Sequence, residues 1–110
     1  MENKATLTYE DLLRVSAIMK DYVKAKDEDD KKALKNNIKD FVTFIKTTTN
    51  DFEKEIQVSL KKPLKEESKK TLSSVLKETF KTLEKKNYSP DSIKVANKIL
   101  QKLITKLKYL

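Results

Sequence analysis

The sequence predicts an all-α fold, an antiparallel four-helix bundle that forms a single helical domain over residues 1–110. Apolar residues recur at spacings of three and four in four successive segments, which is the period of an amphipathic helix. The chain contains no glycine and only two prolines, so the tight turns of β-hairpins would be hard to build. Short polar links between the segments favour helices that return alongside one another.

The first helix is expected over about residues 8–26. Thr8 begins it, because its hydroxyl can accept from the amide of Asp11 while the Asp11 carboxylate reaches back, a capping box with aspartate in the glutamate position. The apolar residues that follow on one face are Leu12, Val15, Met19 and Tyr22. The acidic run 27–30 ends this helix and supplies a negative first turn for the next one.

The second helix is expected over about residues 30–62. Its apolar positions are Leu34, Ile38, Phe41, Val42, Ile45, Phe52, Ile56 and Leu60. At about 100° per residue they stay on one face across the stretch 47–50, which favours one long helix with a kink. Three consecutive threonines weaken helix propensity there, and Asn50 with Glu53 forms a second capping-box pattern, so a break near residue 49 is the alternative.

The third and fourth helices are expected over about residues 63–86 and 90–109. Pro63 marks the first of these boundaries, because proline restricts the residue before it to extended conformations and is tolerated at a first helical position. Ser89 can cap the fourth helix, with Pro90 at its first position. The apolar residues of this helix are Ile93, Ala96, Leu100, Leu103, Leu107 and Leu110.

An unbroken second helix would be about 48 Å long and would extend beyond its neighbours. Its end would expose three apolar side chains, those of Phe52, Ile56 and Leu60. An exposed apolar patch of this kind marks an interaction site. The sequence therefore predicts a partner-binding surface here, covered by another protein or by a second copy of the chain in a homo-oligomer.

Charge is divided unevenly along the chain. Residues 1–55 carry 11 basic and 12 acidic side chains, whereas residues 56–110 carry 14 and 5, which together give the net charge of +8. A positive field of this size attracts polyanions and acidic protein faces. Lysines outnumber arginines 24 to 1, so we expect flexible point charges that contact phosphates without reading bases.

The fourth helix separates an apolar face from a face that carries only lysines. These lysines are Lys94, Lys98, Lys102, Lys106 and Lys108, and no acidic residue follows Asp91. A second row on the third helix, Lys77, Lys81 and Lys85, is diluted by glutamates. We expect these lysines to bind a nucleic-acid backbone or an acidic partner subunit, and a lysine face that serves only solubility is the structural alternative.

The residue types present argue against catalysis. The chain has no histidine and no cysteine, which excludes imidazole acid–base chemistry, thiolate zinc sites and disulfides, and without glycine it cannot form a phosphate-cradling glycine loop. We therefore expect no enzymatic activity, cofactor, metal or small-molecule substrate. The N-terminal residues lack the pattern of a signal peptide and no apolar stretch approaches the length of a membrane span, so a soluble cytoplasmic protein is expected.

These patterns predict a non-catalytic binding or accessory protein whose basic C-terminal half contacts nucleic acid or an acidic subunit. The alternative is a pure protein–protein interaction module, such as an accessory subunit or a mobile-element-encoded inhibitor of a host protein. Such a module would use the exposed apolar residues of the second helix.

Overall fold

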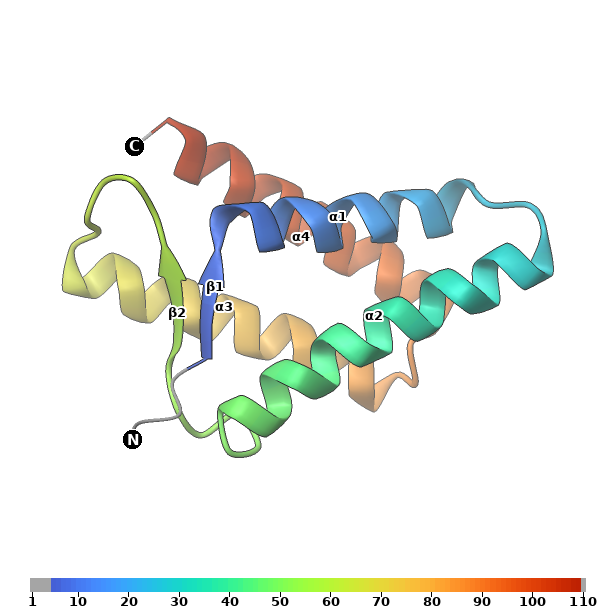
Figure 1. Ribbon diagram of the computed structural model, residues 1–110, viewed down its shortest axis with the longest axis horizontal. Coiled ribbons are helices and arrows are strands. Elements are labelled where there is room, and N and C mark those ends of the chain that lie inside the picture. Colours follow the sequence, from blue (N-terminus) through green and yellow to red (C-terminus); the bar gives the residue numbers. More distant parts are fainter. Residues whose placement is uncertain (1–4, 110) are drawn as a thin grey trace.

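The computed structural model describes residues 5–109, which form four helices and a two-stranded sheet (Figure 1). In chain order the elements are β1 (Ala5–Thr8), α1 (Tyr9–Lys24), α2 (Glu28–Thr48), β2 (Ile56–Ser59), α3 (Glu66–Lys85) and α4 (Pro90–Lys108). The prediction of a mostly helical fold is confirmed. The finer arrangement, an antiparallel four-helix bundle, stays a prediction.

The small sheet is parallel, with Ala5 opposite Ile56 and Thr8 opposite Ser59. The expectation that the chain contains no strands is therefore wrong. The lack of glycine disfavours tight hairpins, but parallel strands are joined by long crossover connections instead, and here α1 and α2 make that connection. The sheet is part of the core, because Leu7 and Ile56 are buried.

Two predicted helix starts are confirmed by their cap geometry. The Thr8 amide donates to Asp11 Oδ2 at 2.9 Å, and the Asp11 amide donates to Thr8 Oγ1 at 3.1 Å, so the capping box is formed. At the start of α4, the Ser92 amide donates to Ser89 Oγ at 3.2 Å and Pro90 occupies the first helical position. Both starts depend on local side-chain chemistry.

The long second helix is wrong, and the alternative of a break near residue 49 is confirmed, because α2 ends at Thr48. Asn50, Asp51 and Phe52 then adopt left-handed conformations, with φ of 53°, 61° and 66°. The buried Thr49 side chain holds this reversal, since its Oγ1 donates to the Ile45 carbonyl at 2.7 Å and accepts from the Phe52 amide at 2.9 Å. The chain therefore turns back instead of overhanging.

The predicted apolar overhang is wrong as a consequence. Phe52 is 5% exposed and Ile56 is 1% exposed, and Leu60 is half-buried beyond the end of β2. Phe52 and Ile56 are four residues apart, as two residues on one face of a helix would be. Both are buried for a different reason: Phe52 packs into the core from the reversal, and Ile56 begins a strand that faces the same core. Phe52 and Ile56 therefore lie in the core and not on a surface for a partner protein, whereas Leu60 stays partly exposed.

The core is one apolar cluster to which all four helices and both strands contribute, together with Phe52 and Tyr88 from the connections. In Figure 1, α1 lies in front of α4, and α1 contacts both α4 and α2. Between α1 and α4, the buried Ser16 hydroxyl donates to Asn97 Oδ1 at 3.3 Å. At the other side of the fold, the Ile56 amide donates to the buried Ser73 hydroxyl at 2.9 Å, which joins β2 to α3.

Candidate functional site

Within residues 5–109, no three side chains of the metal-ligating types come close enough together to hold an ion. None of the helices in the same range is both long enough and apolar enough to cross a bilayer. The features that could bind another molecule are a cavity at the end of the sheet, the lysine face of α4 and an apolar groove beside it.

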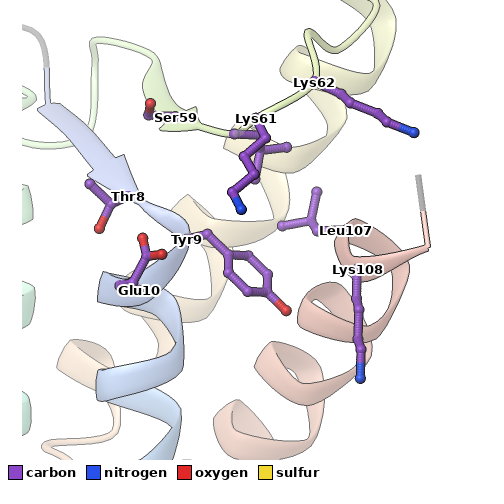
Figure 2. A pocket seen from close by; sticks show the side chains of 9 residues that line it. Thr8, Tyr9, Glu10, Ser59, Lys61, Lys62, Leu107 and Lys108 are labelled. Atoms are coloured by element: carbon purple, nitrogen blue, oxygen red, sulfur yellow. The ribbon is translucent and has the colours of Figure 1, made fainter.

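A cavity of about 640 Å³ lies beyond the C-terminal ends of the two strands (Figure 2). It is lined by Thr8, Tyr9 and Glu10 at the start of α1, by Ser59, Leu60, Lys61 and Lys62 after β2, and by Leu107 and Lys108 of α4. This edge of a parallel sheet is where ligands of open α/β sheets bind. The location alone does not show that a ligand binds, so the directions of the lining side chains have to be considered.

The polar groups of this cavity do not converge. Figure 2 shows Lys61 extending toward Tyr9 and Glu10, whereas Lys62 and Lys108 extend away from the cavity. The Thr8 hydroxyl is engaged in the cap of α1. A lysine and a glutamate are not the nucleophile–base pair of covalent catalysis, so this lining does not by itself point to a reaction.

The lysine face of α4, hereafter the lysine ridge, consists of Lys94, Lys98, Lys102, Lys106 and Lys108. The helix turns Ile93, Ala96 and Leu100 into the core, and all five ridge lysines are exposed on its other side. Within the described residues, no carboxylate lies within ion-pair distance of a ridge lysine. The ridge is therefore a surface of one charge sign.

Helix electrostatics accounts for only part of the ridge. The helix dipole favours cations in the last turn, which holds Lys106 and Lys108. The effect falls off within one turn of the helix end, so it does not explain Lys94, Lys98 and Lys102. Like charges at i and i+4 repel one another, so this row weakens the helix slightly unless a bound anion neutralises it.

The second predicted row, on α3, is divided by the fold. Lys77 is half-buried and its Nζ donates to the Glu53 carbonyl at 3.3 Å, in the loop that follows α2. Lys81 and Lys85 are exposed on α3, which packs against α4. Of the three lysines predicted for this row, Lys81 and Lys85 are therefore the ones that could extend the ridge.

An apolar groove of about 340 Å³ lies between α3 and α4, hereafter the α3–α4 groove. It is lined by Ser74, Val75, Glu78, Thr79 and Thr82 of α3 and by Ser92, Val95, Ala96 and Ile99 of α4. Sequence reasoning missed it, because a groove between two helices depends on how they pack. The available signal was the pair Val95 and Ile99, four residues apart on the flank of the predicted apolar face.

Comparison with known proteins gives no match: no family model, curated protein or solved structure is significantly similar to the chain. Function therefore has to be argued from the site itself.

Proposed function

We propose that this protein is a non-catalytic binding protein whose lysine ridge contacts the phosphate backbone of nucleic acid. The observation that supports the proposal is the ridge of five exposed lysines, none of which is paired with a carboxylate among residues 5–109. A segregated positive surface attracts a polyanion over distances set by the ionic strength. Nucleic acid as the ligand implies a location inside the cell, which is part of the same proposal.

The chemistry of lysine defines how such binding would behave. An ammonium group is a strongly hydrated point charge, so it contacts phosphate oxygens without the bidentate geometry that reads a guanine edge. We therefore expect weak dependence on base sequence. Because each neutralised phosphate releases counterions, five ridge contacts on duplex DNA give a slope of about −4.5 for log K against log salt.

The test is fluorescence anisotropy of a labelled duplex DNA of mixed sequence, titrated with protein at several salt concentrations. One variant replaces Lys94, Lys98, Lys102 and Lys106 with glutamine. A matched control replaces Lys20, Lys24, Lys26 and Lys32, which are exposed on the first half of the chain, and so removes the same charge. At about 0.1 M salt the ridge variant should lose at least about 100-fold in affinity, and its salt slope should become shallower by about 3 to 4.

Equal losses in the two variants would show that only net charge matters, which contradicts a ridge-specific site. Failure of the wild-type protein to bind DNA at low salt would also reject the proposal and would leave an acidic protein subunit as the ligand of the ridge. The other alternative, a protein-binding surface at Phe52, Ile56 and Leu60, is less well supported, because Phe52 and Ile56 are buried and only Leu60 stays partly exposed.

A further inference from the structure

We infer that the α3–α4 groove is a docking site for an acidic amphipathic helix of a partner protein. The groove adjoins the lysine ridge, with Lys98 and Lys102 at the border between the two, and the inference depends on the apolar lining of the groove. It does not require that the ridge bind nucleic acid.

The floor of the groove is made of small residues whose polar atoms are already used. Ala96, Thr79 and Ser92 are buried there. The Thr79 hydroxyl donates to the Val75 carbonyl at 2.8 Å, and the Ser92 hydroxyl donates to the Ser89 carbonyl at 2.8 Å. Because both hydroxyls are satisfied within their own helices, the groove presents methyl and methylene groups, and an apolar side chain can enter it without leaving a polar group unpaired.

The walls of the groove leave apolar surface in contact with water. Val95 is 54% exposed, and Val75 and Ile99 are only partly buried. Covering such side chains is favourable in proportion to the apolar area removed from water. A groove between two helices suits a third helix, which would present anchors at i, i+3 or i+4 and i+7.

The charge around the groove selects the kind of helix. Lys98 and Lys102 follow Val95 and Ile99 by three residues on α4, so each lies beside an apolar wall residue. On α3, Lys85 follows the groove residue Thr82 by the same interval, and Glu78 is the carboxylate that lines the groove. A partner helix whose acidic residues lie on the α4 side of its apolar face, away from Glu78, would therefore complement Lys98 and Lys102, which favours acidic partners over basic ones.

The same observations disfavour two other occupants. A nucleic-acid backbone has no apolar surface that would fill the space beside Val95. A second copy of this chain carries a net charge of +8 and would bring a basic protein against a basic rim.

The test uses two labelled synthetic peptides of about 18 residues, long enough to form a helix on binding. Both have leucines at i, i+3, i+4 and i+7, and the remaining positions carry glutamates in the acidic peptide and lysines in the basic peptide. By anisotropy, the acidic peptide should bind at least about tenfold more tightly than the basic one. Binding of the acidic peptide that is no tighter than binding of the basic peptide would overturn the inference.

Variants locate the binding in the groove. Val95→Asp puts a carboxylate on the groove wall and should weaken the acidic peptide at least about tenfold, whereas Val23→Asp, at an exposed valine of α1, should leave it unchanged. Thr82→Trp, at another exposed wall position, fills the groove without adding charge and should cause a similar loss. Circular dichroism melts of all three variants identify any that unfold.

Two results would contradict the assignment of the groove to an acidic helix. Equal effects of Val95→Asp and Val23→Asp would show that the peptide binds elsewhere. Sedimentation that reveals a dimer abolished by Val95→Asp would give the groove to a second copy of the chain. The uncharged Thr82→Trp variant should keep the duplex DNA affinity of the wild type, so failure of this inference and failure of the proposed function are read from separate assays.

Discussion

Lys46 of α2 and Glu84 of α3 form an ion pair, with 2.9 Å between Nζ and Oε1. The hydrogen bond from Lys46 to Glu84 raises the pKa of the Lys46 ammonium. Burial, and then the charge of Glu84, raise the pKa of the Tyr88 phenol at the turn between α3 and α4. Lys39 Nζ lies 5.8 Å from the centroid of the Tyr88 ring. These side chains therefore link α2 to α3 and to the turn before α4, and the strength of the link depends on the protonation of Lys46 and Tyr88.

The first prediction is a loss of stability at alkaline pH. Because the folded-state pKa values of Lys46 and Tyr88 are raised, their protonated forms stabilise the fold fully below about pH 10, and this contribution is lost as the pH rises through the folded values. Urea unfolding at pH 8, 10 and 11 should show the decline. Tyr88→Phe should make it less steep, whereas Tyr109→Phe, at an exposed tyrosine, should not. An identical decline in the Tyr88→Phe variant would contradict the assignment.

The second prediction concerns left-handed residues in a chain without glycine. Asn50 and Asn87 follow the ends of α2 and α3 with φ of 53° and 52°. Relief of the left-handed strain outweighs the added entropy of the unfolded chain, so Asn50→Gly and Asn87→Gly should each raise the free energy of unfolding by roughly 0.5–1 kcal/mol. The control is Asn36→Gly, at an exposed position inside α2, which should lower it by a similar amount. Chemical denaturation measures the three free energies of unfolding. Destabilisation by all three substitutions would contradict the left-handed conformations of Asn50 and Asn87.

The third prediction tests the link between β2 and α3. The Ser73 hydroxyl is buried and accepts from the Ile56 amide, so Ser73→Ala leaves that amide without its partner. We expect a loss of about 1–3 kcal/mol in the free energy of unfolding. Ser74→Ala, at the adjacent exposed serine, should change it by less than about 0.5 kcal/mol. Equal effects of the two alanines would show that the bond contributes nothing.

The fourth prediction tests whether β1 belongs to the core. Leu7 is buried in β1 and Leu13 is exposed on α1. Leu7→Ala should cost about 2–5 kcal/mol, as other buried leucine truncations do, whereas Leu13→Ala should cost far less. Thermal and urea unfolding provide the comparison. A small effect at Leu7 would mean that the first strand does not contribute to the stable fold.

The parts of the fold that the sequence predicts correctly are those decided by neighbouring residues. The caps at Thr8 and Ser89 use atoms within three residues of one another, and the amphipathic pattern of α4 places its lysines on the outer face. These signals are local, so no knowledge of the packing is needed to interpret them.

The parts that were missed depend on distant contacts. The spacing of Phe52 and Ile56 fits a helix as well as it fits a reversal followed by a strand. The strand is stabilised by distant residues, because Ile56 pairs with Ala5 and its amide donates to the Ser73 hydroxyl. A strand of four residues is too short to show a distinct periodicity. The α3–α4 groove has the same origin, since each helix supplies only half of it.

The parallel pairing of β1 with β2 has a consequence for the order of folding. Ala5 and Ile56 are 51 positions apart, so the ribosome releases the first strand long before its partner exists. Helical contacts are local and form early, whereas a pairing across this distance must wait until the intervening chain has been ordered. The strand that is synthesised earlier is therefore secured late in folding, and newly made chains that stop short of residue 59 would leave Leu7 without its place in the interior.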